Sequence, residues 1–238
     1  MKKFIGTLLI LLLLSSCADE KPKGNLQITG NVKGLKKGTL YIQKLRDTTL
    51  VLMDSIVVNG DSEFATELNI ESPEMLYLFL DRGVTDKIDN NLMFFAAPGK
   101  ITIETNLETF YADAKITGSK NHDLYEEFKK VKGRFSGQEL ELVEKRLKAF
   151  QSGETVTEAE SQAKSDAITK KKYLYAINFA LNNKAYEVSP YIALSEIRDA
   201  NIKYLDTIHK SLAPKVAQSH YGKMLAELIA ERKKTEGQ

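Results

Sequence analysis

Cys17 is the only cysteine in the 238-residue chain, and its neighbours limit the chemistry that its thiol could perform. A lone cysteine excludes an intrachain disulfide, a Cys-x-x-Cys redox pair and a zinc site built from several thiolates. Cys17 follows Leu14-Ser15-Ser16 at the end of an apolar run. Small residues after such a run are typical of a signal-peptide cleavage site.

The residues before Cys17 have the pattern of a signal peptide. Met1-Lys2-Lys3 is positively charged, and Phe4 to Leu14 is mostly apolar. A helix of that length covers roughly 16 Å, against about 30 Å of membrane hydrocarbon, so it is too short to span. The whole segment resembles the signal and lipobox of bacterial lipoproteins. That resemblance implies diacylglycerol on the Cys17 sulfur and removal of residues 1–16; an ordinary secretory signal with a chance cysteine is the alternative.

Residues 17–25 are polar and include a proline, which predicts a lipidated tether. Two or more acyl chains hold a protein stably where one is marginal, so we expect Cys17 to anchor the chain to a membrane of the bacterial cell envelope. The expected site is the outer membrane, on its periplasmic or its surface face. Asp19 and Glu20 resemble export signals for surface display, and a generic solvated linker is the alternative reading of them.

The charge balance bears on the class of partner. The chain has 34 basic and 32 acidic residues, and removing Lys2 and Lys3 with the signal leaves 32 against 32. A nucleic-acid binder needs a basic surface that displaces counterions from phosphates. Nucleic acid is therefore not an expected partner, whereas an envelope protein or a small ligand is.

Residues 26–118 have the pattern of an antiparallel β-sandwich or partial barrel, with turn residues about every 8 to 12 positions. Asn59-Gly60 is a strong hairpin signal, so we expect the segment 63–68 to pair with the segment 50–58. The nearly all-apolar segment 74–80 is expected to be a central strand. The expected strands are 26–32, 39–45, 50–58, 63–68, 74–80, 92–96, 101–105 and 114–118.

Residues 119–238 change to a helical period, which predicts an α+β chain with an all-helical C-terminal region, built as two domains or as one unit. Ser119 is the expected N-cap of a helix through Lys132, and Ser189-Pro190 is expected to supply an N-cap followed by a proline at the first helical position. Further helices are expected over 165–182, 201–212, 214–218 and 219–233. Another helix has one apolar face formed by Leu140, Val143, Leu147 and Phe150.

Candidate catalytic and cofactor residues are few. The histidines show no zinc-binding spacing and are expected at surface or cap positions; they are His122, His209 and His220. Phosphate-loop and Gly-x-Ser-x-Gly motifs are missing, and we expect Gly30, Gly34 and Gly38 to be turn glycines. No catalytic residue, metal site or cofactor is assigned, so the chain is not expected to be an enzyme. Scattered carboxylates leave an unrelated hydrolase as a minor alternative.

A group of tyrosines is the remaining candidate for ligand binding, although packing between helices is the commoner role of such residues. Its members are Tyr173, Tyr175, Tyr186 and Tyr191.

Two stretches together resemble the N-terminal region of TlpA/ResA-like thiol–disulfide oxidoreductase lipoproteins. The first runs from Ile28-Thr29-Gly30-Asn31-Val32 to Glu63-Phe64, and the second joins the segment 188–194 to His220-Tyr221-Gly222-Lys223. In that family a β-rich domain of unknown function and a helical segment precede a thioredoxin-like domain with a Trp-Cys-x-x-Cys site. This chain has no tryptophan and one cysteine, so no catalytic residue of the family can be carried over.

The resemblance and the missing redox pair lead to two functional hypotheses. The first is a membrane-anchored, non-catalytic binding or interaction module. The second is the non-catalytic half of a split thiol–disulfide oxidoreductase, whose thioredoxin domain is encoded separately.

Overall fold

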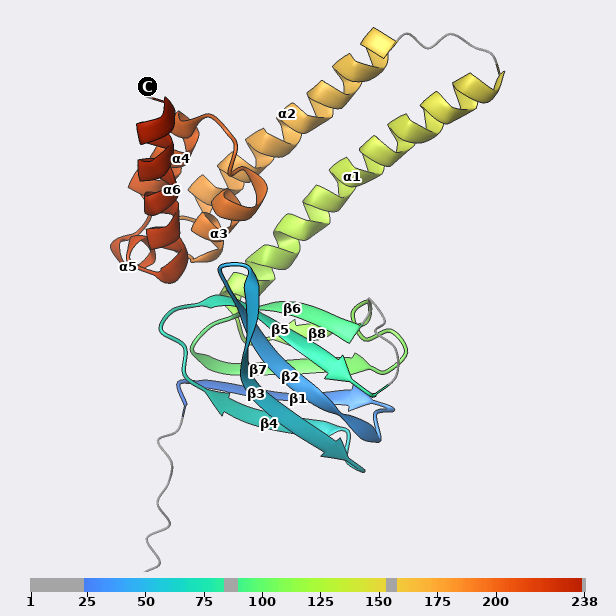
Figure 1. Cartoon of the computed structure of the whole chain (residues 1–238), viewed down its shortest axis with the longest axis vertical. Helices are drawn as coiled ribbons and strands as arrows, with labels where there is room; N and C mark the ends of the chain where they lie inside the picture. The colour runs from blue at the N-terminus through green and yellow to red at the C-terminus, as the bar shows by residue number, and fades with distance from the viewer. Residues whose placement is uncertain (1–23, 84–89, 153–157, 237–238) are drawn as a thin grey trace, which may run out of the picture.

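The computed structural model describes residues 24–83, 90–152 and 158–236. A β-sandwich formed by the first part of the chain carries a helical region on one side, and a long helical hairpin projects from that region (Figure 1). This is the α+β architecture expected from the change of period near residue 119. The signal segment 1–16, Cys17 and the tether up to residue 23 lie outside the described residues.

The sandwich consists of two four-stranded sheets in the described residues, with strand orders β4-β1-β7-β8 and β3-β2-β5-β6. Their inward-facing side chains alternate along each strand and form one apolar core, which includes Ile28, Leu78 and Phe94. The strands are β1 (Leu26–Lys33), β2 (Lys37–Arg46), β3 (Thr49–Asn59), β4 (Glu63–Leu68), β5 (Glu74–Asp81), β6 (Asn91–Ala96), β7 (Gly99–Asn106) and β8 (Lys115–Thr117).

The hairpin expected at Asn59-Gly60 is wrong. β3 pairs with β2, whereas β4 pairs with β1 in the other sheet. Gly60 does adopt a positive φ of 99°, and its N–H donates to the Lys36 carbonyl at 2.8 Å. The Asn-Gly signal therefore located a tight turn, but the turn carries the chain from one sheet to the other. Phe64 and Leu68 of β4 are buried in the core that the two sheets share.

One pairing departs from the expected antiparallel arrangement. β1 and β7 run parallel, from Leu26 opposite Gly99 to Lys33 opposite Asn106, while the other described pairs are antiparallel. Short turns impose antiparallel pairing only on strands adjacent in sequence, and these two are far apart in the chain.

Two of the expected turn glycines lie inside strands. Gly34 has a φ of 89° and is a turn glycine, but Gly30 lies in β1 and Gly38 in β2. A Cβ on Gly30 would stand 2.2 Å from the Ile103 carbonyl oxygen and 2.6 Å from the Phe64 ring. Gly30 is therefore required by the close approach of its neighbours rather than by a turn.

The helical region begins as expected at Ser119, whose Oγ accepts a hydrogen bond from the His122 N–H at 3.2 Å. The expected stop at Lys132 is wrong, because one helix of 33 residues continues through Gly133 and Gly137. Its glycines weaken a helix without breaking its hydrogen-bond ladder. The helices are α1 (Lys120–Ser152), α2 (Glu158–Asn182), α3 (Val188–Glu196), α4 (Ile202–Ser211), α5 (Pro214–Ala217) and α6 (His220–Glu236).

The cap expected at Ser189 is also wrong. α3 begins at Val188, and the Ser189 hydroxyl donates to the Ala180 carbonyl of α2 at 2.8 Å. Pro190 is then the third helical residue rather than the first. That position is still in the first turn, where a missing N–H leaves no intrahelical bond unmade.

The helical region packs on the outer face of β5 and β6. The side chains of Met75 and Phe95 are not part of the sandwich core and pack instead in a second core with Leu124, Ile192 and Leu225 of the helices. β5 lies between β2 and β6 and is covered on both faces, which confirms the expected central strand and explains its nearly continuous apolar sequence.

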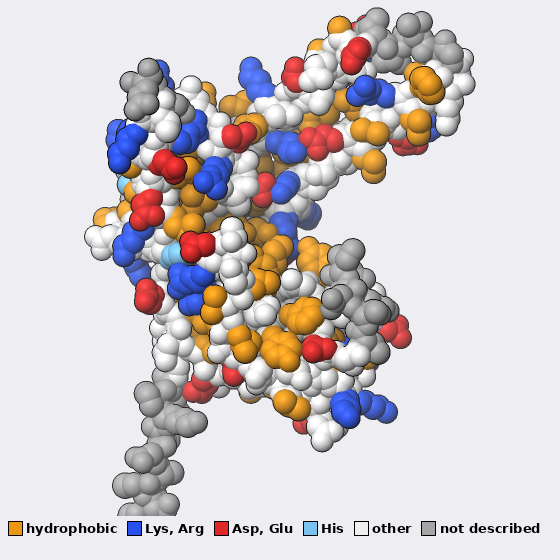
Figure 2. Space-filling model, viewed as in Figure 1, with side chains coloured by type: hydrophobic (Ala, Val, Ile, Leu, Met, Phe, Trp, Pro, Cys, Tyr) orange, Lys and Arg blue, Asp and Glu red, His pale blue; other side chains and the backbone are white. Residues whose placement is uncertain are grey.

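The distal half of α1 extends away from both cores. Leu140, Val143, Leu147 and Phe150 lie on one helix face as expected, but their side chains are 57–84 % exposed. Figure 2 shows hydrophobic side chains at the surface of this projecting hairpin. No helix within the described ranges is both long and apolar enough to cross a membrane.

Candidate functional site

A cleft of about 540 Å³ lies where the sandwich meets the helical region. One wall is the tip of the β2–β3 hairpin with Leu45 and Arg46, and the opposite wall comes from α3 and α6 with Leu194 and Met224. The hairpin tip rises beside the helical region, so residues far apart in sequence share this cleft (Figure 1). Leu45 and Met224 are 45 % and 41 % exposed, so two large apolar side chains face solvent at its mouth.

Aromatic rings form the floor of the cleft. Tyr191 and Tyr221 line it, with ring centroids 5.1 Å apart. Both also contact the buried Phe95 ring of β6 edge-on, at 5.5 and 5.9 Å. Edge-to-face pairs at these distances hold the rings in defined orientations. The floor is therefore rigid and attached directly to the outer face of the sheet.

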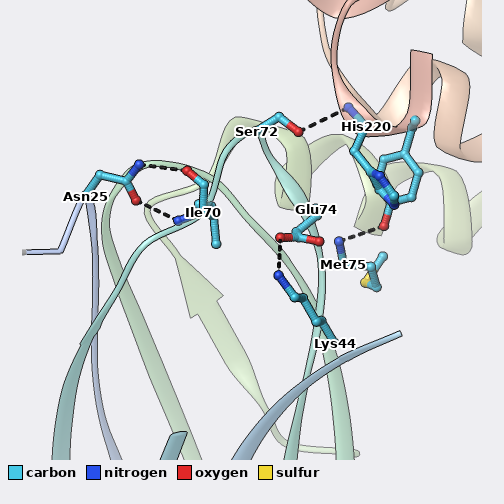
Figure 3. Close-up of polar contacts among 8 residues, drawn as sticks. Asn25, Lys44, Ile70, Ser72, Glu74, Met75 and His220 are labelled. Carbon is cyan, nitrogen blue, oxygen red and sulfur yellow. Dashed lines mark hydrogen bonds and ion pairs between the residues drawn. The ribbon is translucent and has the colours of Figure 1, made fainter. Parts of the chain in front are cut away.

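Polar contacts join the strand at the base of the cleft to α6 (Figure 3). The Met75 N–H donates to the Tyr221 hydroxyl oxygen at 2.9 Å, and the His220 N–H donates to the Ser72 Oγ at 3.2 Å. Lys44 and Glu74 form an ion pair with 3.7 Å between Nζ and Oε1, and the Glu74 side chain is only 7 % exposed. The two hydrogen bonds join the start of α6 to β5 and to the segment before it, and the ion pair joins β2 to β5.

The tyrosines and the histidine of the cleft are neutral near pH 7. Burial raises the pKa of Tyr191 and of Tyr221 far above that of a free phenol, and burial also raises the pKa of Tyr77. Burial lowers the pKa of His220, and the nearby Arg46 lowers it further. The floor thus offers neutral hydroxyl and imidazole groups among apolar surface, while the charged residues Arg46, Asp47, Lys223 and Glu227 line the cleft as well.

Such a site is suited to binding an apolar or aromatic group that also carries a hydrogen-bonding atom. Ligand sites in proteins commonly combine apolar walls with a few polar groups that fix orientation. No three His, Cys, Asp or Glu side chains gather as a metal site would require, among the residues that the structure describes.

A second, smaller cleft of about 260 Å³ lies between α1, α2 and α3. Phe128, Phe135 and Tyr175 line it, and Lys132 bridges to Glu196 across it at 2.8 Å. Most of its lining groups already contact one another, since the ion pair joins its two charged side chains and the Phe128 and Tyr175 rings are stacked. The first cleft is the stronger candidate site because its apolar mouth is open.

The tyrosines singled out in the sequence are not brought together. Tyr191 lies in the floor of the first cleft, while Tyr173 and Tyr175 line the second. The Tyr173 hydroxyl donates to Asp199 at 2.6 Å, and Tyr186 is 36 % exposed elsewhere.

The surface or cap role expected for His122 is wrong. Its side chain is 4 % exposed, and its Nδ1 accepts a hydrogen bond from the Phe95 N–H at 3.4 Å. Its Nε2 lies 3.6 Å from the Glu126 carboxylate. Burial is the main cause of its lowered pKa, so the neutral ring connects α1 to β6. His220 starts α6 at the cleft, and His209 lies near the end of α4.

Sequence reasoning missed most of the cleft residues as a group. Leu45, Met75 and Met224 come from segments without a chemical motif, and only the fold brings them together. Tyr221 lies in one of the stretches that resemble TlpA/ResA-like lipoproteins, but its spacing in the sequence did not predict that it lines a cleft.

The sandwich and its junction with α1 match a known protein family. Residues 26–125 match the family described as Domain of unknown function (DUF4369). The match ends at Tyr125, whose ring packs 5.8 Å from Tyr191 in the second core. A search of curated proteins finds no match to the chain.

Proposed function

We propose that this protein is a membrane-anchored envelope lipoprotein that acts as a non-catalytic binding or interaction module. Its binding site is the cleft between the β2–β3 hairpin and helices α3 and α6. The observation that carries the proposal is the combination of an exposed apolar mouth, formed by Leu45 and Met224, with a rigid aromatic floor.

The proposed ligand is an apolar or aromatic group of an envelope protein or of a small molecule. Neutral phenols are hydrogen-bond donors and acceptors rather than nucleophiles, and the raised pKa values of Tyr191 and Tyr221 keep them neutral. This supports recognition of a ligand through hydrogen bonds. Anchoring would come from lipid on Cys17, for which the support is the lipobox-like segment 14–17.

Native mass spectrometry of the protein solubilised from its own membranes tests the binding site. Met224→Glu places a carboxylate at the apolar mouth, and Tyr204→Glu places one on an exposed position of α4 outside the cleft. We expect wild type and Tyr204→Glu to carry an added mass that Met224→Glu has lost. Equal added mass on all three proteins, or none on wild type, would overturn the assignment of the cleft.

A second candidate function is the accessory half of a split thiol–disulfide oxidoreductase. The observation that favours it is the sequence resemblance of the segments 28–64 and 188–223 to the N-terminal region of TlpA/ResA-like lipoproteins. The reading frame next to this gene decides between the two candidates. A thioredoxin-like frame there supports the split enzyme, and an unrelated neighbour in intact genomic context counts against it.

A further inference from the structure

Helices α1 and α2 form the projecting hairpin (Figure 1), and a groove of about 440 Å³ lies between them. Its lining residues lie within 138–146 of α1 and 161–171 of α2, at intervals that place them on one face of each helix. The groove shares no lining residue with either cleft described above. It is therefore a separate candidate site.

Four basic side chains line this groove, together with one carboxylate. The basic residues are Lys145 and Arg146 of α1 and Lys164 and Lys171 of α2, and the carboxylate belongs to Glu141. All four cations are exposed, and none has an ion-pair partner among the residues that the structure describes. Other lysines of the same hairpin are paired, Lys148 with Glu144 at 2.7 Å and Lys172 with Glu139 at 2.9 Å. The groove thus has an excess of uncompensated positive charge, which favours an anionic ligand.

Apolar side chains separate the charges along the groove. Leu142 and Ile168 line it and are only partly buried, so each leaves apolar surface open to a ligand. An inorganic anion would leave this surface in contact with water, and a neutral hydrocarbon would leave the four cations without a partner. The lining therefore matches a molecule that has both a charged head and an apolar chain.

A buried hydroxyl provides a second polar contact. Ser161 lines the groove with only 3 % of its surface exposed, and its hydroxyl has no hydrogen-bond partner among the described residues. A buried polar group gains free energy when it finds a partner, so a ligand oxygen in the groove would accept a hydrogen bond from Ser161. Lys164 follows Ser161 by three positions and therefore lies on the same helix face.

The order of these residues gives the groove a direction. On α1, Lys145 and Arg146 follow Leu142, and on α2, Ser161 and Lys164 precede Ile168. Because the chain reverses between α1 and α2, all four lie on the side of the apolar pair that is nearer to the tip of the hairpin. A charged head would therefore lie toward the tip, with the chain behind it.

We propose that the groove binds one free anionic amphiphile. Its carboxylate or phosphate head contacts Lys145, Arg146 and Lys164, and its hydrocarbon chain lies against Leu142 and Ile168. The planar guanidinium of an arginine can donate two parallel hydrogen bonds to such a head. This site is additional to the cleft at the sandwich, so the chain has two binding sites of different chemistry.

Two other anionic partners fit the groove less well. Its described lining residues include no aromatic ring on which a nucleic-acid base could stack. The flat surface of a bilayer would meet only the rims of a groove between two helices, whereas a single chain can enter it.

Isothermal titration calorimetry with dodecyl phosphate tests the proposal. The sample is full-length protein in nanodiscs of neutral phosphatidylcholine, and empty nanodiscs measure partition of the probe into lipid. We expect saturable binding of one molecule per chain. Dodecyl maltoside has a similar chain without the charge, and inorganic phosphate has the charge without the chain. Each should bind at least about tenfold more weakly than dodecyl phosphate.

Substitutions locate the bound head. Arg146→Gln combined with Lys164→Gln should weaken binding of dodecyl phosphate at least about tenfold, since two charge-assisted hydrogen bonds are lost. Lys148→Gln removes one cation of the same hairpin outside the groove and should bind like wild type. Met224→Glu, in the cleft at the sandwich, should also bind like wild type, so the two sites are tested separately. Circular dichroism of each variant checks that the helices are retained.

Several results would overturn the proposal. Binding no stronger than to empty nanodiscs would show that the groove takes no amphiphile, and equal affinity for inorganic phosphate would show that the chain contributes nothing. An equal loss in Lys148→Gln would show unspecific attraction to the hairpin, and a loss in Met224→Glu alone would place the probe in the cleft. Flotation of the nanodisc-held protein with phosphatidylglycerol vesicles, without saturable binding of dodecyl phosphate, would show that a bilayer is the partner.

Discussion

The hydroxyl oxygen of Tyr221 accepts a hydrogen bond from the backbone N–H of Met75 at 2.9 Å, and this bond joins helix α6 to strand β5 across 146 residues of sequence. Met75 is buried, so its N–H has no access to solvent once the two parts have met. The same tyrosine ring forms part of the cleft floor. The Tyr221 side chain therefore contributes both to the cleft and to the contact between α6 and β5.

Tyr221→Phe removes the acceptor and leaves the Met75 N–H unsatisfied. An unpaired buried donor costs about 1–3 kcal/mol, so we expect the free energy of unfolding to fall by that amount. Urea denaturation followed by circular dichroism measures it. The matched control is Tyr204→Phe, at a tyrosine that is 48 % exposed, with an expected change within about 0.5 kcal/mol. Equal stability of the two variants would show that the bond contributes nothing.

Glycine substitutions separate close packing from helix propensity. Gly30→Ala places a methyl group 2.2 Å from the Ile103 carbonyl oxygen and should destabilise the sandwich by about 1–3 kcal/mol or more. Gly137→Ala meets no atom within 4 Å in α1 and should stabilise the protein by up to about 1 kcal/mol. Thermal unfolding of both variants is the measurement. A tolerated Gly30→Ala would contradict the register of β1, β4 and β7.

Stability is expected to fall as the pH is lowered below about 6.5. The folded-state pKa values of His122 and His220 are lowered, mainly by burial, so the unfolded chain binds protons first as the pH falls through 6.5. The stabilising contribution is complete above pH 6.5 and is lost below it, until the folded-state pKa values are reached. The slope is at most about 1.4 kcal/mol per pH unit for each histidine.

His122→Asn isolates the part of this pH dependence that comes from His122. Asparagine can still accept the Phe95 N–H through its side-chain oxygen, but it does not titrate. Denaturation midpoints at pH 8 and pH 5.5 should differ less in His122→Asn than in wild type, whatever the absolute loss of stability. An unchanged difference between the two midpoints would mean that His122 does not contribute to the pH dependence of stability.

Cys17→Ser tests the anchor. We expect the variant to leave the membrane fraction, because the sulfur that would carry the lipid is gone. Its circular dichroism spectrum and unfolding midpoint should match those of wild type, since residue 17 precedes β1. Persistence of Cys17→Ser in the membrane fraction after a high-salt wash would contradict lipid anchoring.

The local sequence pattern was enough to predict the strands, and to predict that a β-rich part of the chain precedes a helical part. Alternation in Leu26–Lys33 and the cap at Ser119 act over a few residues, and the structure confirms both. The partner strand of β4 is β1, which is distant in sequence, and no local turn signal contains that pairing. The helix end predicted at Lys132 was wrong because weak helix formers such as glycine do not stop a helix.

The cleft was beyond prediction for the same reason. Its residues come from the β2–β3 hairpin, β5, α3 and α6, and only the packing of the helices on the outer face of β5 and β6 brings them together. The apolar row on α1 was visible in the sequence, but a row of this kind does not reveal whether the same chain covers it.

Site-specific photocross-linking in intact cells tests the central claim most directly. A benzophenone amino acid is introduced at Met224, at the mouth of the cleft, and at Tyr204 on α4 as the control of similar exposure. We predict a discrete adduct from position 224, lost when Leu45→Glu is added, and no such adduct from position 204. No adduct at position 224 above that at position 204 would contradict a binding function for the cleft.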